Sequence, residues 1–331
     1  MSLQISKPRT ERIGFLLQPR FSMLSLFSAL EPLRVVNRFS GSLFSWHFLS
    51  VDGEPVMSSS GIPVAAEQSI ESATDDDFSI IFVCASFEPE LTIDKQLTNW
   101  LRLMARKGLV LGGIETGCYA LAYANLLDDH AIALHWESKL AFQESFPHLK
   151  TTEQLYQVDE KRITCAGGAT SMDMMLDLIA RKHGKVLSEQ ICAAFMHEPV
   201  TPSNSMQRLQ TVQRLGIRHP DVTQVIEIME QHLEEPLNIA QLVEMSGIEQ
   251  RKLERLFKKH CHDSPIGFYL RLRLERARQL LKQSRLSVVD VAVACGFHSP
   301  EYFSRRYRKV FGKSPREDRK LAPELSRMSL N

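Results

Sequence analysis

Two short stretches in the last third of this 331-residue chain carry hydrogen-bonding and basic side chains at helical spacing. Both stretches combine Arg with amide, carboxylate, hydroxyl or imidazole groups, which are the groups that bond to the edges of DNA bases. Arg pairs with guanine through two bonds, Gln pairs likewise with adenine, and Glu accepts from the amino group of cytosine. The candidate base-reading residues are Gln250, Arg251, Glu254 and Arg255 in the first stretch, and His298, Ser299, Glu301, Ser304 and Arg305 in the second.

Further basic residues follow each stretch and suit contacts with phosphates, which position a protein on DNA without reading its sequence. They are Lys258, Lys259, Arg308, Lys309 and Lys313. The overall charge of +1 hides an asymmetry, because residues 251–320 hold 19 Lys and Arg against 7 Asp and Glu, a net charge of +12. A basic block on an acidic body is typical of a chain that binds nucleic acid through one part only.

The elements that present these side chains form one pattern that occurs twice, at 238–260 and 287–310. In each copy a residue able to cap a helix precedes a short apolar helix, a glycine ends it, and a second helix with an apolar and a basic face follows. The pattern predicts two helix-turn-helix motifs. A single copy is equally well read as a helical hairpin with a solvated basic face, and the duplication argues against that reading. The capping residues are Asn238 and Ser287, and the turn glycines are Gly247 and Gly296.

A segment between the copies, 266–283, reads as one helix through Leu270, Leu274, Ala277 and Leu281. At 1.5 Å per residue it spans about 27 Å. It is therefore long enough to hold the two basic helices about one turn of DNA apart, roughly 34 Å, in successive major grooves.

A further set of residues in 221–320 follows a known pattern: Leu253, Arg255, Phe257, Ser264, Pro265, Leu274, Ala277, Leu280, Leu281, Ala292, Cys295, Gly296, Phe297, Phe303, Arg305, Phe311, Gly312, Ser314 and Pro315. With these residues, 221–320 resemble the DNA-binding region of the AraC/XylS family of bacterial transcription regulators. His262 and Asp318 depart from the family pattern, which usually has Gly and Tyr there. The resemblance implies a regulator that activates a catabolic operon, RNA polymerase as a partner, and homodimerisation through the N-terminal domain.

The N-terminal part alternates strand-like and helix-like segments, which predicts an α/β domain with a parallel sheet covered by helices on both faces. Such sheets place ligands beyond the carboxyl ends of their strands. The predicted strands lie at 13–18, 46–51, 80–85, 109–114, 131–135 and 163–166, and the predicted helices at 21–39, 93–106, 116–127 and 171–183.

Residues 108–127 read as a strand, a sharp turn and a helix. This layout resembles the nucleophile elbow of the class I glutamine amidotransferase-like fold, a flavodoxin-like fold, in its PfpI-like branch. The similarity covers 11–195 and includes SALEPLRVVNR at 28–38, HWE at 135–137 and CAGGATSMDMMLDLIARKHG at 165–184. Enzymes of this fold carry Cys at the elbow, and here the residue is Glu115.

A carboxylate at the elbow cannot replace a thiolate as the nucleophile of these enzymes. Cys118 lies about one helical turn further on, away from the tip of the elbow. The sequence therefore predicts a ligand-sensing domain rather than an enzyme. The alternative is a PfpI-like hydrolase or lyase with an appended DNA-binding region.

Glu115 at the elbow is expected to pair with a cationic group, such as the ammonium or guanidinium of an amino acid or the quaternary amine of a betaine-like compound. Backbone N–H groups at Thr116 and Gly117 are the candidates for the ligand's carboxylate. His135 and Cys84 are further candidates. Alternatively, Glu115 only interacts favourably with the helix dipole, His135 has a structural role, and Cys84 packs in the core.

The six cysteines form no CxxC pair and have no His at ligand spacing, so no metal and no cofactor is expected. No run approaches the roughly 20 apolar residues of a membrane span, and the N-terminus lacks a secretion signal, which predicts a cytoplasmic protein without membrane contact. Residues 196–220 are rich in Pro, Ser, Asn, Gln and Arg. They read as a linker between a sensing domain at 11–195 and a DNA-binding domain at 221–320.

Overall fold

The computed structural model describes residues 10–75, 77–197, 203, 217, 219–284 and 286–319. The chain divides into two compact units between Gln207 and Arg208. Two clusters of buried apolar side chains form the core of the N-terminal unit, and a further cluster lies in the C-terminal unit. Most of the linker expected at 196–220 lies outside the described residues.

The N-terminal unit is built on a seven-stranded sheet in the order β5-β2-β1-β6-β7-β9-β8. Neighbouring strands are parallel except for β8, which pairs antiparallel with β9. The predicted α/β fold with a mostly parallel sheet is confirmed. The strands are β1 (Glu11–Leu17), β2 (Phe44–Ser50), β5 (Gln68–Ser69), β6 (Ile80–Ala85), β7 (Val110–Glu115), β8 (Tyr156–Val158) and β9 (Arg162–Cys165).

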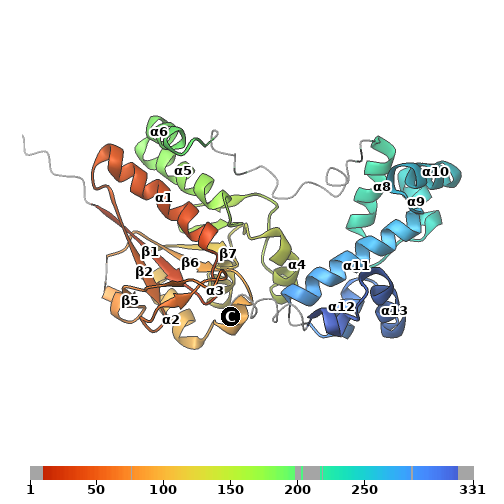
Figure 1. The fold of residues 1–331 in the computed structure, drawn as a ribbon, viewed down its shortest axis with the longest axis horizontal. Coiled ribbons are helices and arrows are strands. Elements are labelled where there is room, and N and C mark those ends of the chain that lie inside the picture. The colour runs from red at the N-terminus through yellow and green to blue at the C-terminus, as the bar shows by residue number, and fades with distance from the viewer. Residues whose placement is uncertain are drawn as a thin grey trace, which may run out of the picture. The chain divides into compact units, whose positions relative to one another are not determined.

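Helices cover both faces of this sheet (Figure 1). Successive residues of a strand point to opposite faces, so Phe15 packs with α1, α5 and α6, whereas Leu16 packs with α2, α3 and α4. The strands are consequently apolar on both sides, as buried parallel strands must be. The helices are α1 (Met23–Ser40), α2 (Lys95–Arg106), α3 (Cys118–Tyr123), α4 (Trp136–Ser145), α5 (Thr170–His183) and α6 (Lys185–Phe195).

Smaller elements fill the connections: a hairpin of β3 (Val56–Met57) with β4 (Pro63–Val64), and two single turns, η1 (Ser72–Asp75) and η2 (Pro89–Leu91). The strand predicted at 131–135 is wrong, because that segment forms only one isolated bridge, from Ile132 to Thr151. The neighbouring Ala133 N–H donates to the Thr164 hydroxyl, 2.9 Å away, instead of to a strand.

Two glycines let α3 lie directly on the sheet behind the elbow. A Cβ at Gly117 would lie 1.9 Å from the carbonyl oxygen of Val83, and a Cβ at Gly113 would lie 2.5 Å from the backbone nitrogen of Cys118. Both close contacts are with backbone atoms, which cannot swing aside as a flexible side chain can. The turn from β7 into α3 therefore requires glycine, which has no side chain, at both positions.

The C-terminal unit is entirely helical in its described part, with α9 and α10 forming one helix-turn-helix and α12 and α13 the other. Figure 1 shows α11 running between the two pairs. This arrangement confirms the predicted all-α domain with two such motifs and the bridging helix. The helices are α8 (Pro220–Gln231), α9 (Ile239–Ser246), α10 (Gln250–Cys261), α11 (Pro265–Gln283), α12 (Val288–Ala294) and α13 (Pro300–Phe311).

Both predicted helix caps are present. The Asn238 side chain accepts from the Gln241 N–H at 3.0 Å, and the Gln241 side chain accepts from the Asn238 N–H at 2.9 Å. Ser287 and Asp290 form the same reciprocal pair in the second motif, at 3.1 and 3.2 Å. Each capping box satisfies two backbone donors that the first turn of a helix leaves free.

The two departures from the family pattern have structural roles. His262 adopts a left-handed conformation, with φ +56°, after α10, where glycine is the more usual residue. Asp318 is 3% exposed, and its carboxylate accepts from the guanidinium of Arg278 and the hydroxyl of Tyr307, each at 2.8 Å. Burial alone would raise the pKa of Asp318, but these two donors bring the pKa below its ordinary value. Asp318 thus ties α11 to α13.

Among the described residues, no helix combines the length and the apolar character that crossing a bilayer requires.

The contact between Gly117 and β6 yields the first prediction. Gly117 has a helical φ of −58°, so Gly117→Ala adds only the collision with Val83, and we expect a loss of about 2 kcal/mol or more in unfolding free energy. Gly108→Ala is the control, because Gly108 follows α2 with φ +84° and has open space, so the change adds only backbone strain of about 1 to 2 kcal/mol. Urea unfolding monitored by tryptophan fluorescence measures both variants. A smaller loss for Gly117→Ala than for Gly108→Ala would contradict the contact.

Candidate nucleic-acid interface and elbow site

Helix α10 presents its candidate base-reading residues on one exposed face. Leu253, Leu256 and Phe257 are buried in the core of the C-terminal unit, which fixes the rotation of the helix about its axis. The amide of Gln250 donates to the carboxylate of Glu254 at 2.9 Å, so these two side chains are held together one turn apart. The exposed candidates are Gln250, Arg251, Glu254 and Arg255.

Helix α13 is oriented in the same way by buried Phe303 and Tyr307. Ser299 caps it, accepting from the Tyr302 N–H at 3.1 Å, and its hydroxyl donates to the Glu301 carboxylate at 2.9 Å. The guanidinium of Arg305 lies 5.7 Å from the centre of the Tyr302 ring. Of the candidates on this side, Ser304 is half-buried, whereas His298, Ser299, Glu301 and Arg305 are exposed.

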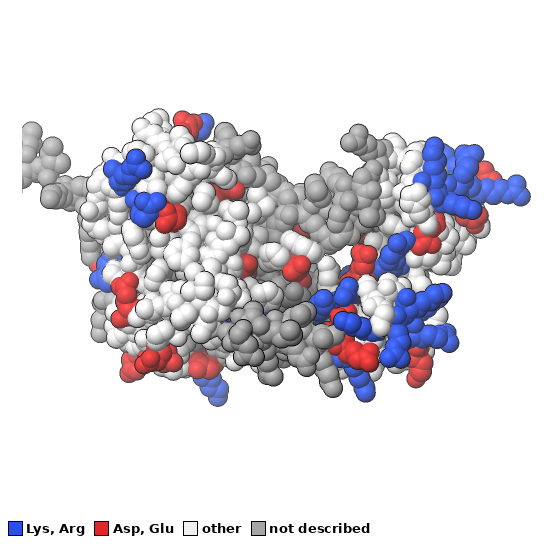
Figure 2. Space-filling view, in the orientation of Figure 1, with Lys and Arg blue, Asp and Glu red and all other residues white. Residues whose placement is uncertain are grey.

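The candidate phosphate-binding residues are all exposed. Figure 2 shows Lys and Arg side chains gathered over the C-terminal unit, whereas the visible face of the N-terminal unit carries few of them. Arg308 also lies 3.6 Å from the Glu317 carboxylate, a surface ion pair that competes only weakly with a phosphate. The residues are Lys258, Lys259, Arg308, Lys309 and Lys313.

Glu115 occupies a strained position at the carboxyl end of β7. Its φ of +57° is left-handed, which is uncommon for a residue with a Cβ and marks functional turns. Its side chain lies directly over Gly167, where a Cβ would approach the Glu115 Cγ to 1.9 Å. The Glu115 Oε2 atom is buried and has no hydrogen-bond partner among the described residues. A buried polar atom of this kind calls for an explanation.

The protonation of Glu115 is set mainly by its burial. The pKa of Glu115 is raised to about 7, mainly by burial and to a lesser extent by the charge of Glu137, whereas hydrogen bonds with the Ser86 and Ser25 side chains act to lower it. The Ser25 hydroxyl also accepts from the Gly168 N–H at 2.6 Å, which ties α1 to the loop after β9. Three segments distant in the sequence thus meet at Glu115.

The cysteines around the elbow are buried and protonated. The Cys118 thiol donates to the Glu115 carbonyl at 3.8 Å, and burial raises its pKa well above the ordinary value. Burial also raises the pKa of Cys84 and of Cys165, and the charge of Glu115 adds to both shifts. None of the three is a thiolate nucleophile at neutral pH.

The other predicted ligand-binding residues are largely engaged within the protein. The Thr116 hydroxyl donates to the Ser86 carbonyl at 2.6 Å. The Gly117 N–H, which the sequence predicts to bind a ligand's carboxylate together with the Thr116 N–H, donates to the Ile114 carbonyl at 3.0 Å. His135 caps α4 through its Nδ1 atom, which accepts from the Glu137 N–H at 3.4 Å, and burial lowers the pKa of His135.

Gln18 is a residue at this sheet edge that the sequence did not single out. It follows β1, and its N–H donates to the Cys84 carbonyl at 2.9 Å, which places it beside the end of β6. The side chain is 1% exposed, and neither its oxygen nor its nitrogen has a hydrogen-bond partner among the described residues. Gln18 and Glu115 thus flank β6 with unsatisfied polar atoms.

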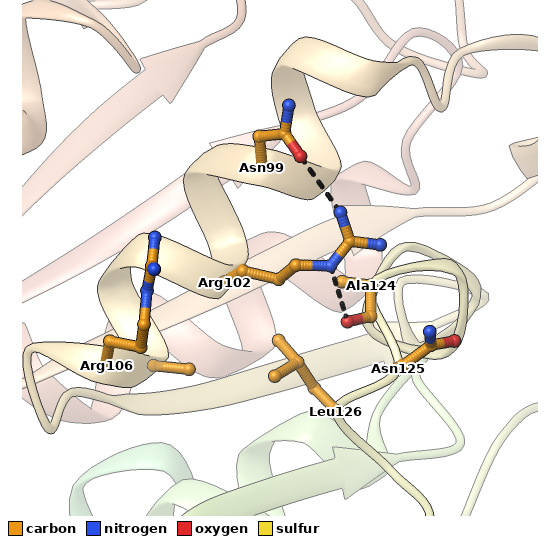
Figure 3. A pocket seen from close by; sticks show the side chains of 7 residues that line it. Asn99, Arg102, Arg106, Ala124, Asn125 and Leu126 are labelled. Carbon is orange, nitrogen blue, oxygen red and sulfur yellow. Dashed lines mark hydrogen bonds between the residues drawn. The ribbon is translucent and has the colours of Figure 1, made fainter.

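A shallow hollow borders the other end of α3 (Figure 3). Arg102 lines this hollow, and its guanidinium makes three hydrogen bonds. It donates to the Asn99 side chain at 2.9 Å and to the carbonyls of Ala124 and Tyr123 at 3.0 and 3.1 Å. Arg102 therefore serves as the C-terminal cap of α3 and links it to α2.

Among the described residues, no group of three or more His, Cys, Asp or Glu side chains is placed to hold a metal ion.

Comparisons with known proteins match both units. A family described as "DJ-1/PfpI family" matches residues 12–181, and one described as "Helix-turn-helix domain" matches 242–321. The HTH-type transcriptional regulators CdhR and GbdR of Pseudomonas aeruginosa are 48% and 40% identical, over 93% and 95% of this chain and 91% and 85% of their own. A crystal structure of an AraC family transcriptional regulator from Pseudomonas putida is 28% identical with a TM-score of 0.51, covering 56% of this chain and 99% of that one.

The raised pKa of Glu115 gives a pH prediction. The folded chain keeps a proton that the unfolded chain releases, so Glu115 lowers the stability as the pH rises from about 4.5 to about 7. Glu115→Gln removes this effect. We expect its stability relative to the parent to increase by about 2 to 3 kcal/mol between pH 5 and pH 8.

Urea unfolding followed by tryptophan fluorescence measures this difference in the full chain, because Trp46, Trp100 and Trp136 all lie in the N-terminal unit. A relative stability that is the same at both pH values would show that Glu115 ionises normally.

Proposed function

This chain belongs to the AraC-type HTH transcriptional regulators that carry a DJ-1/PfpI unit, and on that premise we propose that it is a ligand-responsive activator of a catabolic operon. Residues 11–195 sense a small amino-acid-like or betaine-like metabolite, residues 196–220 link the two domains, and residues 221–320 bind DNA.

The observation that carries the sensing proposal is the buried, unpartnered Oε2 of Glu115 at the strained elbow. Leaving such an atom unsatisfied costs about 1 to 3 kcal/mol. A ligand that supplies a positive charge there recovers this cost and stabilises the ionised carboxylate. An ammonium or guanidinium does so through hydrogen bonds, and a quaternary amine does so through charge attraction alone.

Gln18 supports a ligand with a second polar group. Parallel strands are about 4.8 Å apart, so β1 and β7, separated by β6, lie about 10 Å apart. This separation suits a small zwitterion whose cation meets Glu115 and whose carboxylate accepts from the Gln18 amide. In this proposal the Gln18 amide joins the backbone N–H groups at Thr116 and Gly117 as a donor to the ligand's carboxylate, while Cys84 and His135 shape the site around the ligand.

The two exposed faces of α10 and α13 support reading of double-stranded DNA by both motifs. Each face combines Arg with Gln, Glu, Ser or His, and the flanking Lys and Arg side chains suit phosphates. We assign Arg255 and Arg305, which occupy matching positions in the two repeats, as the principal contacts to bases. The resemblance to AraC/XylS regulators further supports a homodimer formed through the N-terminal domain and a contact with RNA polymerase.

The first test of this proposal concerns the ligand. We screen amino acids, polyamines and betaines against the full chain by melting followed through tryptophan fluorescence. A compound at about 100 times its Kd stabilises the parent by about 2.7 kcal/mol. Glu115→Gln should lose this stabilisation, because it removes the charge that the cation pairs with. Glu144→Gln, an exposed carboxylate on α4, is the control and should keep it. Equal stabilisation of the parent and Glu115→Gln would refute the role of Glu115.

The second test concerns DNA, using duplexes that the parent selects from a random library. Arg305→Ala should weaken binding to the selected site by about 1 to 3 kcal/mol and relax sequence preference at the bases it reads. Lys258→Ala should weaken binding to all duplexes similarly and reduce the salt dependence by about one unit of slope. Titrations at several salt concentrations measure both quantities. If Arg305→Ala weakened all sequences equally, the residue would be a phosphate contact instead.

A further inference from the structure

The turn glycine of the second motif touches the loop that leads into the first motif. Gly296 adopts φ +71°, and a Cβ there would lie 2.6 Å from the carbonyl oxygen of Glu234, 2.6 Å from the Pro236 Cδ and 3.0 Å from the carbonyl oxygen of Leu233. These atoms belong to the loop between α8 and α9, which leads into the first motif. We name residues 233–236 together with Gly296 the repeat junction.

Helix α11 bonds to the first-motif side of this junction through Tyr269. The Tyr269 side chain is 2% exposed, and its hydroxyl donates to the carbonyl of His232, which ends α8. The same hydroxyl accepts from the Leu237 N–H at 3.4 Å. One hydroxyl therefore holds both ends of the α8–α9 loop.

One turn further along α11, Arg273 bonds to the second-motif side. Its Nε donates to the Cys295 carbonyl at 2.9 Å, and its Nη2 donates to the Gly296 carbonyl at 2.6 Å. Its guanidinium also lies 4.2 Å from the centre of the Phe297 ring. The planar fork of Arg is suited to two acceptors and a ring at once, which a Lys ammonium is not.

We propose that the repeat junction, together with Tyr269 and Arg273, sets the spacing and angle of the two reading helices, so that α10 and α13 engage DNA as one unit. Helix α11 sets the distance between the motifs and packs against both of them. The junction adds a contact that bypasses α11. A change in the angle between the motifs disturbs that contact at Gly296 and the hydrogen bonds that Tyr269 and Arg273 donate to the carbonyls of His232, Cys295 and Gly296.

This inference goes beyond the proposed function, but it rests on the assignment of α10 and α13 as the reading helices. Two linked readers gain affinity only when their geometry allows simultaneous engagement, and that gain reaches about 10² to 10⁴. The effect of the junction is therefore measured as the gain in affinity that the second DNA site adds. A residue that only supports the fold of one motif would not change this gain selectively.

The chain provides a matched control for the junction. Gly247 ends α9 in the first motif with φ +67° and has open space around it. Gly247→Ala and Gly296→Ala thus impose the same left-handed strain on equivalent turns. Only Gly296→Ala adds a collision with the loop that leads into the other motif.

The experiment uses the full chain and three duplexes: one selected from a random library that carries both protected sites, and two derivatives in which one site is scrambled. Affinity for the two-site duplex divided by affinity for the duplex that keeps the first-motif site gives the gain. We expect Gly296→Ala to reduce the gain by about tenfold or more, with first-site affinity kept within about twofold, and Gly247→Ala to preserve the gain.

A gain in Gly296→Ala equal to that of Gly247→Ala overturns the junction proposal. A parent that shows no gain from the second site overturns the two-reader assignment and the junction with it. If Gly296→Ala fails to fold by circular dichroism, Tyr269→Phe decides by the same criterion, because it removes only the hydroxyl that holds the α8–α9 loop. A gain unchanged in Tyr269→Phe then overturns the proposal.

Discussion

The C-terminal unit depends on the need to satisfy backbone carbonyl groups where its second motif meets the loop that leads into the first. The carbonyls of His232, Cys295 and Gly296 end or follow short helices and have donors from Tyr269 and Arg273, one turn apart on α11. Buried carbonyls without donors are costly, so both motifs are held to the same stretch of one helix. The lack of a side chain at Gly296 lets the second motif also touch the loop that leads into the first. Rigid presentation of α10 and α13 follows from these contacts.

The N-terminal unit applies a comparable constraint at the elbow. Close packing of α3 on β6 and β7 leaves no room for side chains at Gly113 and Gly117, and Glu115, between these two glycines, adopts a left-handed conformation over Gly167. The fold that elsewhere exposes a nucleophile here holds a buried carboxyl group with a pKa of about 7. A group that changes charge near neutral pH suits recognition of a cation, since the ligand's charge decides whether ionisation is favourable.

Much of this architecture was predictable because it is encoded locally. The capping boxes at Asn238 and Ser287, the left-handed turns at Gly247 and Gly296, and the apolar strands of the sheet all follow from residue type and spacing. Features that depend on contacts distant in the sequence were not predictable. The antiparallel edge strand β8 is only three residues long, and the apolar run at 131–135 fails as a strand because a Thr164 side chain takes its backbone donor. The sequence around Gln18 and Gly296 does not indicate the buried position of Gln18 or the close contact at Gly296, because a single Gln or Gly can have many roles.

Whether α10 and α13 read DNA together is tested most directly by a hydroxyl-radical footprint of the full chain on a duplex selected from a random library. Two rigidly spaced readers should protect two stretches on one face of the duplex, with centres about one helical turn, roughly 10 base pairs, apart. A single protected stretch, or two stretches on opposite faces, would contradict the view that α10 and α13 read DNA together.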